Sequence, residues 1–235
     1  MEQIKIDRRK RYILMLDTET ANTLTDEDGS LDMRYALPYD IGWAIIDKYG
    51  NIFRARSFVN SDIFYGMADI MTSAYYAKKI PQYMEDITNG TRIVANTYTI
   101  RKTLLDDFAE FECVAVCAHN ARFDYNSLNN VQRWTTKSKY RYFLPYGVEI
   151  WDTMRMARDV VAKMPTYIRF CEENDYMTAN GKPRLTAEIL YRFIAHDDNF
   201  IEAHTGFEDV QIEAQILAYC YRQHKKMRKE CFSKK

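Results

Sequence analysis

The sequence has little of what marks several classes of protein. Its 235 residues include only five cysteines, and no two of them form a C-x-x-C pair. An odd number of cysteines without that spacing argues against a disulfide framework and against a zinc site. Reduced thiols fit a cytoplasmic protein best. No apolar run is long enough to span a membrane, and residues 1–5 do not begin a signal peptide, so we expect no membrane partner.

Prolines and glycines are also few. The chain has five prolines and eight glycines, and no stretch combines them with serine into a linker. Internal repeats and low-complexity tracts are absent as well. With 47% hydrophobic residues the chain can bury a large core, so we expect a single domain over residues 1–235.

The chain has no surplus of charge either. Its net charge is zero, which does not by itself indicate a nucleic-acid-binding protein. The charge is unevenly distributed, however, because residues 8–11 carry +4 and residues 225–235 carry +5. Either these runs attract phosphates beside an acidic centre, or they are solvated, flexible ends at about 1–10 and 225–235.

Hydrophobic patterns predict an α/β fold. The predicted strands are residues 12–17, 40–47, 52–59, 113–117 and 148–151. A polar loop at 22–32 follows the first of them. Helical patterns dominate residues 62–110, begin again near Asp124 and recur three times after the last strand. We therefore expect a mixed five-stranded sheet, a three-strand meander and then two parallel strands, flanked by helices.

Two acidic residues follow the first predicted strand. The apolar run from Tyr12 to Leu16 predicts a buried strand, and Asp17 and Glu19 come directly after it. Side chains alternate along an extended chain, so the two carboxylates point the same way. Carboxylates this close repel each other unless a cation lies between them, and a divalent metal ion is the usual one.

A second group of polar residues follows the buried strand at 113–117. His119, Asn120 and Asp124 lie here, which places Asp124 at the junction of strand and helix. Ligands of open α/β sheets bind at this rim of the sheet. Taken alone, Asp124 fits a helix N-cap better, and His119 fits a hydrogen-bonded structural residue better.

The third group begins a late helix. Thr205 and Glu208 match the S/T-x-x-E capping box, which predicts that a helix begins just after Thr205. Asp209 then lies early on that helix, and His204 lies in the loop before it. Taken alone, Asp209 is explained by the helix dipole and His204 by a position on the surface.

The three groups occur in an order that resembles a known family. Asp-x-Glu after one buried strand, Asn-x-x-Phe-Asp after another and His-x4-Asp at a late helix are similar to the DEDDh branch of the DEDD 3′–5′ exonucleases. That branch includes epsilon-type proofreading subunits, RNase T and oligoribonuclease. The resemblance extends from Tyr12 to about His224, although Gly206 stands where the family usually has alanine. It implies an RNase H-like fold.

The resemblance also assigns roles to nine residues. The acids that would bind two divalent cations, Mg²⁺ or Mn²⁺, are Asp17, Glu19, Asp124 and Asp209. His204 would be the general base. The residues that would lie beside the substrate are Thr18, Thr20, Asn120 and Phe123. Four carboxylates balance the charge of two divalent cations, and a histidine with an ordinary pKa of about 6.5 can accept a proton near neutral pH.

The leading prediction is a metal-dependent 3′–5′ exonuclease that acts on single-stranded DNA ends. It would act in proofreading, with a DNA polymerase or replisome protein as partner, or alone in end processing. An exoribonuclease similar to RNase T is the alternative, because nothing in the sequence visibly recognises a 2′-hydroxyl. A non-catalytic nucleic-acid-binding or polymerase-binding module and an unrelated α/β protein are further alternatives. The presence of all five residues of the set favours an enzyme.

Overall fold

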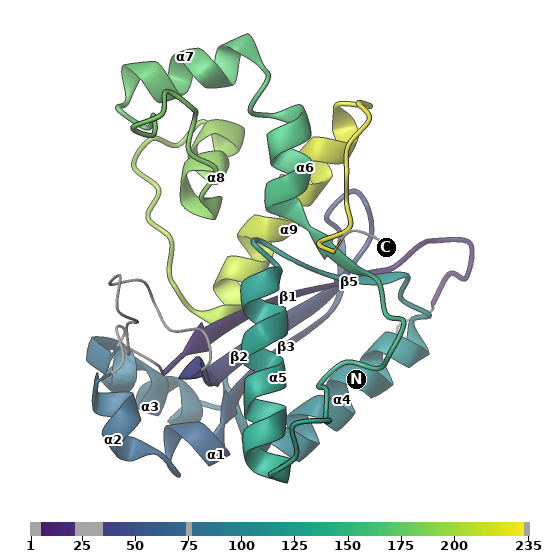
Figure 1. Ribbon diagram of the computed structural model, residues 1–235, viewed down its shortest axis with the longest axis vertical. Coiled ribbons are helices and arrows are strands. Elements are labelled where there is room, and N and C mark those ends of the chain that lie inside the picture. The colour runs from purple at the N-terminus through teal and green to yellow at the C-terminus, as the bar shows by residue number, and fades with distance from the viewer. Residues whose placement is uncertain (1–5, 22–34, 74–76, 233–235) are drawn as a thin grey trace.

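Figure 1 shows the fold in a computed structural model. The structure describes residues 6–21, 35–73 and 77–232, so the polar loop predicted at 22–32 lies outside the described residues. A six-stranded mixed sheet crosses the middle of the molecule, with helices on both of its faces. The α/β fold class predicted from the hydrophobic patterns is confirmed.

The strands follow the order β4-β3-β2-β1-β5-β6 across the sheet. They are β1 (Ile13–Thr20), β2 (Pro38–Ile46), β3 (Ile52–Asn60), β4 (Ile93–Ala95), β5 (Ala115–Ala118) and β6 (Ile150–Asp152). β1, β2 and β3 form the predicted antiparallel meander, while β5 pairs parallel with β1 and β6 pairs parallel with β5. Because parallel strands end at the same edge, the residues after β1 and those after β5 meet there.

The sheet has one strand more than predicted. β4 pairs parallel with the outer edge of β3, inside the region whose sequence pattern is helical. The strand has three residues, and Ile93 and Val94 are exposed, so it lacks both the length and the alternation that reveal a strand in a sequence. The five predicted strands are therefore corrected to six within the described part of the chain.

Helices cover both faces of the sheet. In Figure 1, α1 to α5 lie below the sheet and α6 to α9 lie above it. The lower set comprises α1 (Ser61–Phe64), α2 (Ala68–Ser73), the one-turn 3-10 helix η2 (Ala77–Lys79), α3 (Ile80–Thr88), α4 (Thr97–Glu110) and α5 (Arg122–Thr136). The upper set comprises α6 (Thr153–Val160), α7 (Pro165–Glu173), α8 (Ala187–Ala195) and α9 (Gly206–Arg222).

Four helices follow β6, where the sequence pattern predicted three. α6 and α7 are separate because Pro165 can begin a helix but cannot continue one. Among the described residues, every helix is too short or too polar to span a bilayer.

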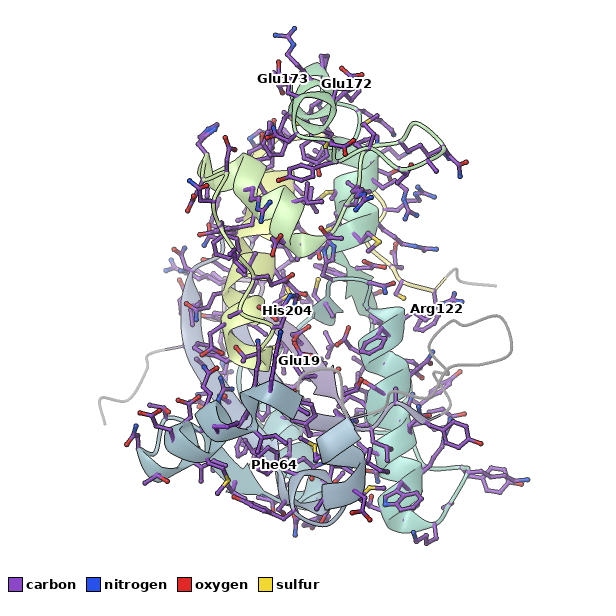
Figure 2. The ribbon with its side chains drawn as sticks, turned by 90° about the vertical axis from the view of Figure 1, so that its left-hand side faces the viewer. Glu19, Phe64, Arg122, Glu172, Glu173 and His204 are labelled. Atoms are coloured by element: carbon purple, nitrogen blue, oxygen red, sulfur yellow. The ribbon has the colours of Figure 1, made fainter. Side chains whose placement is uncertain are left out.

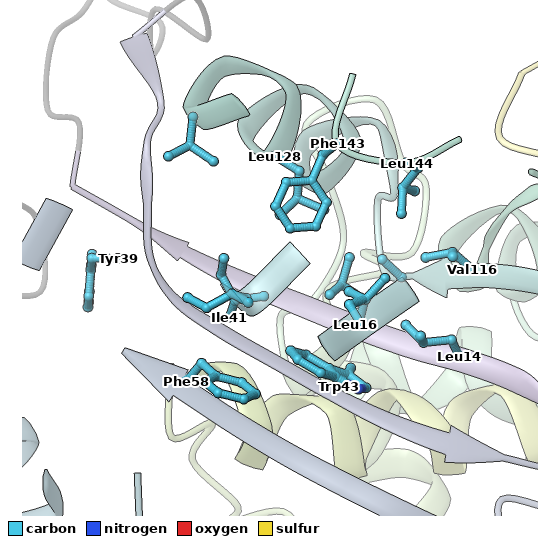
Figure 3. Packing of buried hydrophobic residues seen from close by; sticks show 14 of the residues in the cluster. Leu14, Leu16, Tyr39, Ile41, Trp43, Phe58, Val116, Leu128, Phe143 and Leu144 are labelled. Atoms are coloured by element: carbon cyan, nitrogen blue, oxygen red, sulfur yellow. The ribbon is translucent and has the colours of Figure 1, made fainter. Parts of the chain in front are cut away.

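Side-chain alternation along β1 divides the hydrophobic core into two clusters. The even-numbered residues from Leu14 to Thr18 face α4 and α5, and the odd-numbered residues from Ile13 to Glu19 face α9. Figure 3 shows the cluster on the even-numbered side, built around Trp43 of β2. The same alternation that buries the apolar residues therefore directs both acids of β1 toward α9.

β2 and the start of α9 cross with almost no space between their backbones. A Cβ atom on Gly42 would lie 2.3 Å from the carbonyl carbon of Gly206, and one on Gly206 would lie 2.8 Å from the nitrogen of Gly42. Only glycine fits at these two positions. The close approach holds the first turn of α9 against the sheet, next to the end of β1.

The basic end of the chain lies along β6. Lys229 and Cys231 make backbone hydrogen bonds to β6, and the Arg228 guanidinium pairs with Asp159 of α6 at 2.8 Å. Residues 228–231 are therefore attached to the outer edge of the sheet.

Candidate active site

The acids that follow the apolar part of β1 lie on one side of the strand. Asp17 and Glu19 are on the sheet face that α9 covers, and Glu19 is only 9% exposed. The Oδ2 atom of Asp17 is buried and has no hydrogen-bond partner among the described residues. A buried carboxylate oxygen without a donor is costly, unless a proton or a cation occupies it.

Asp124 reaches the same site from the first turn of α5. The Thr18 backbone N–H donates to its Oδ1 atom at 3.1 Å, and the Thr18 hydroxyl donates to the same atom at 2.9 Å. α5 begins at Arg122 without a side-chain cap, so the alternative of a helix N-cap is wrong for Asp124. Thr18, which lies between Asp17 and Glu19 on β1, therefore holds the Asp124 carboxylate in place.

α9 begins directly after Thr205, as predicted, but its start differs from a capping box. The Thr205 hydroxyl donates to the Glu208 carboxylate at 2.6 Å and makes no cap to the helix backbone. Asp209 lies on the first turn and is 4% exposed. Its Oδ1 atom, like the Oδ2 atom of Asp17, is buried without a hydrogen-bond partner within the described ranges.

A buried ion-pair network fixes the start of α9 to the sheet. Arg92 pairs with Asp40 of β2 at 3.0 Å and with Glu208 of α9 at 3.1 Å. The Asp40 carboxylate also accepts a hydrogen bond from the Gly206 N–H at 3.0 Å and one from the Tyr83 hydroxyl at 2.5 Å. Because these contacts join rigid elements, Asp209 has a fixed position relative to β1.

His204 lies in the loop before α9, beside Glu19 and Asp209. The ligand atoms of these three residues lie within 4.8 Å of one another, and Figure 2 shows Glu19 and His204 side by side. His204 has a left-handed backbone with φ 51°, and the Lys79 ammonium donates to its carbonyl oxygen at 3.0 Å. Partial burial and the nearby charge of Lys79 lower the pKa of His204, so its ring is neutral at pH 7.

Burial raises the pKa of all four predicted acids. For Asp124 the pKa rises to about 7, and for Asp209 burial and the Glu202 charge raise it to about 8. For Asp17 the neighbouring charges of Glu213 and Asp124 add to the effect of burial. Carboxylates with raised pKa values and, among the described residues, two buried oxygens without a hydrogen-bond partner fit a divalent cation, and oxygen ligands suit Mg²⁺ or Mn²⁺.

A second group of acids shares His204. The ligand atoms of Glu188, Glu202 and His204 also lie within 4.8 Å of one another. The Glu202 backbone N–H donates to Glu188 at 2.9 Å, and the Glu202 carboxylate lies 3.8 Å from Nδ1 of His204. Burial and the Glu188 charge raise the pKa of Glu202 to about 7. α8 thus holds the loop that carries His204.

Two residues of the site were not predicted from the sequence. Glu213, one turn after Asp209 on α9, is buried and accepts a hydrogen bond from the His119 backbone N–H at 3.1 Å. Its charge is the largest contribution, after burial, to the raised pKa of Asp17. The four-residue spacing from Asp209 to Glu213 is a usable signal, because residues i and i+4 share a helix face. Lys79 has no such signal, because only the tertiary fold brings η2 to the site.

The residues predicted to lie beside the substrate differ in how exposed they are. Thr18 is buried with its hydroxyl already engaged, while Thr20 is partly exposed at the end of β1. Asn120 is exposed with a left-handed backbone, φ 60°, and Phe123 is partly buried. His119 makes contacts through both ring nitrogens, in agreement with a structural role.

Solved structures of Exonuclease I share this fold. E. coli Exonuclease I in complex with a 5cy-dT13 oligonucleotide is 14% identical, with a TM-score of 0.53 over 92% of this chain. Exonuclease I from Methylocaldum szegediense is 17% identical, with a TM-score of 0.52 over 92% of this chain. A zinc-bound form of the E. coli enzyme with single-stranded DNA is 15% identical, with a TM-score of 0.52 over 92% of this chain. The fold is therefore RNase H-like, as predicted.

This chain matches only 41% of the length of each of these three Exonuclease I chains. No protein-family model matches the sequence, and a comparison with curated proteins gives no match. At 14–17% identity the likeness shows the fold alone, so the function depends on the residues of the site itself.

Proposed function

We propose that this chain is a metal-dependent 3′–5′ exonuclease that hydrolyses the 3′ ends of single-stranded DNA to 5′-mononucleotides. The observation that supports the proposal is a cluster in which the ligand atoms of Glu19, Asp209 and His204 lie within 4.8 Å of one another, while the charges of Asp124, Glu19 and Asp209 all act on Asp17. Two of their oxygens, one on Asp17 and one on Asp209, are buried and have no hydrogen-bond partner in the described part of the chain. These features support a cation site at the rim of the sheet where such folds bind ligands.

The residues that would hold the cations are Asp17, Glu19, Asp124 and Asp209. When bound, Mg²⁺ or Mn²⁺ supplies positive charge that activates a water molecule and stabilises the leaving 3′-oxygen. Thr18 prepares Asp124 for this role, because its two hydrogen bonds favour the ionised carboxylate against the effect of burial. α9 gives Asp209 a rigid mount, which keeps the ligand geometry constant between turnovers.

His204 is the proposed general base. Its lowered pKa keeps the imidazole neutral at pH 7, so a ring nitrogen can accept the proton of the attacking water. The side chain is 39% exposed, which lets the ring return that proton to solvent. Lys79 donates to the carbonyl oxygens of Ala203 and His204 and so holds the loop that carries the base.

Single-stranded DNA is the proposed substrate because the structural neighbours include Exonuclease I complexes with DNA oligonucleotides. A ribonuclease with the same five residues would perform the same hydrolysis, and a polymerase partner stays a prediction. Digestion of matched 5′-labelled DNA and RNA oligonucleotides, with Mg²⁺, Mn²⁺ or EDTA, separates these possibilities. We expect a ladder of shortened 5′-labelled DNA products with either cation and none with EDTA or with Asp17→Asn. Full activity in excess EDTA, or cleavage of a closed circular strand, would contradict the proposal.

A further inference from the structure

A groove of about 530 Å³ lies beside Tyr125 in the first turn of α5. The segment from Tyr142 to Ile150 that leads into β6 lines most of it, and Phe232 completes the lining. In Figure 1 this segment runs from the lower end of α5 back up to the sheet. Two groove residues, Leu144 and Ile150, also line a small cavity together with Asp124 and Tyr125, so the groove and the acid site are neighbours.

Exposed aromatic side chains gather at this groove and along the chain that leads to it. Nine large aromatic side chains are exposed among the described residues, and three of them, Tyr142, Tyr146 and Phe232, line the groove. Two more, Trp134 near the end of α5 and Tyr140 after it, lie on the chain that leads to the groove. Exposed aromatic rings in one place mark a binding surface, because isolated ones are tolerated but a group of them costs hydration free energy.

Cations accompany these rings. The Arg122 guanidinium lies 5.5 Å from the ring centroid of Phe232, and the Arg133 guanidinium lies 5.1 Å from that of Tyr142. Two lysines stack in the same way, Lys137 on Trp134 at 4.1 Å and Lys139 on Tyr140 at 5.2 Å. Residues 125–148 contain four lysines and arginines and no aspartate or glutamate, in a chain whose net charge is zero. The surface is therefore both aromatic and positive.

We infer that this groove binds the single-stranded DNA on the 5′ side of the nucleotide being removed, an inference that rests on the proposed function. A single strand offers what the surface needs, which is flat bases that stack on aromatic rings and phosphates that pair with cations. A folded protein partner of ordinary composition would offer no such repeating pair of features. The strand would pass over the start of α5, with its 3′ end at the acids and its preceding nucleotides along Tyr125, Tyr142 and Tyr146. The groove residues of this chain would then bind the strand by themselves. They would do so in a chain that matches only 41% of the length of the Exonuclease I chains.

The test measures the gain in affinity with strand length. Fluorescence anisotropy gives the Kd of oligothymidylates of about 3 and about 12 nucleotides, lengths that bracket the smaller site sizes of single-strand binders. The protein carries Asp17→Asn, which prevents hydrolysis, and the double variant Tyr142→Ala/Tyr146→Ala is added to it. Removal of two stacking rings should weaken binding of the longer strand by roughly tenfold or more and reduce its advantage over the shorter one. Lys137→Gln/Lys139→Gln should lower the slope of log Kd against log salt by roughly 0.7 for each phosphate that is no longer neutralised.

The matched control is Tyr49→Ala. Tyr49 is also exposed and also has a lysine over its ring, Lys48 at 4.9 Å, but it lies in the turn between β2 and β3. This variant should bind both oligonucleotides as the parent protein does. All the substituted side chains are on the surface, and a thermal melt checks that each variant is folded. Equal losses in Tyr49→Ala and the groove variant, or no loss in the groove variant, would overturn the inference.

Two further outcomes are separable. If the unsubstituted protein hydrolyses no oligonucleotide but the groove variant still loses affinity, the proposed exonuclease activity fails and the binding surface stands. If hydrolysis occurs and sedimentation shows a dimer that the groove variant converts to monomer with unchanged DNA affinity, the groove is a self-association surface and the inference is wrong.

Discussion

Asp209→Asn should make the metal-free protein more stable at neutral pH. Burial and the Glu202 charge raise the pKa of Asp209 to about 8 in the folded protein, whereas an unfolded aspartate has a pKa of about 3.9. Between these values the folded state keeps a proton that the unfolded state releases. The free energy of unfolding therefore falls as the pH rises through this window. Asparagine has the same shape and cannot ionise, so it removes this dependence.

The size of the effect follows from the shift. Each unit of pKa difference corresponds to about 1.4 kcal/mol. The free energy of unfolding of the variant should therefore exceed that of the wild type by up to this amount for each pH unit above about pH 4. At pH 7 the difference reaches at most about 4 kcal/mol, a large part of the 5–15 kcal/mol that stabilises a typical domain. The other acids of the site titrate together with Asp209, so part of the pKa shift belongs to them and this figure is an upper limit.

Urea denaturation in excess EDTA at several pH values between about 5 and 7.5 measures the difference. Addition of Mg²⁺ should stabilise the wild type and have less effect on the variant, because the cation binds only the folded arrangement of carboxylates. Asp159→Asn is the control. The Arg228 hydrogen bonds lower the pKa of Asp159, so its contribution to stability is fully present across this range and is lost only below about pH 4. This variant should therefore be less stable than the wild type by an amount that does not change with pH over the range. A wild type whose stability relative to Asp209→Asn stays constant across this range would refute the argument.

Three other substitutions test the site and its supports. His204→Ala should lower turnover by roughly 10²–10⁴-fold while leaving oligonucleotide binding unchanged, and should remove the dependence of the rate on a group with a lowered histidine pKa; an unaltered pH profile would mean that His204 is not the base. Thr18→Val removes one of the donors that lower the pKa of Asp124, so the acid limb of the pH–rate profile should move to higher pH, and Thr18→Ser should restore it. Gly42→Ala places a Cβ atom 2.3 Å from the Gly206 backbone, so it should lower the free energy of unfolding by about 1–3 kcal/mol in denaturant titrations and reduce activity through displacement of α9.

Elements with strong local patterns were predicted well from the sequence. The apolar run of β1, the strand predicted at 52–59 and the start of α9 after Thr205 each depend on neighbouring residues only, and the structure contains all three. Asp17 and Glu19 share a face because alternation along a strand is a local property as well. β4 was missed because it is short and exposed, and its pairing with β3 is a tertiary contact.

The supports of the site could not be predicted in the same way. Arg92 reaches Asp40 and Glu208 across more than 50 residues in each direction, and no local pattern indicates this. Lys79 likewise meets the His204 loop only in the folded chain. The assignment of Asp124 shows the limit of a local argument. A helix cap was the better explanation from sequence alone, yet its actual donors come from Thr18, 106 residues away.

Buried acids in this chain differ in how fully the fold supplies them with hydrogen-bond donors, and the difference bears on the proposed metal ligands. Asp107 of α4 is 2% exposed, but the Trp43 indole and two arginine side chains donate to its oxygens, and these contacts lower its pKa. Asp40 shares features of both kinds, because its Oδ2 atom accepts three hydrogen bonds, while Oδ1 accepts none within the described residues and burial raises its pKa. Asp209 is as deeply placed and Asp17 is half-buried, and within the described residues each has one buried oxygen without a hydrogen-bond partner and a raised pKa. Since the fold supplies hydrogen-bond donors to Asp107, the lack of donors at Asp17 and Asp209 among the described residues favours the proposed cation site. Buried oxygens without donors cost stability, and the divalent cation of the proposed function would remove that cost.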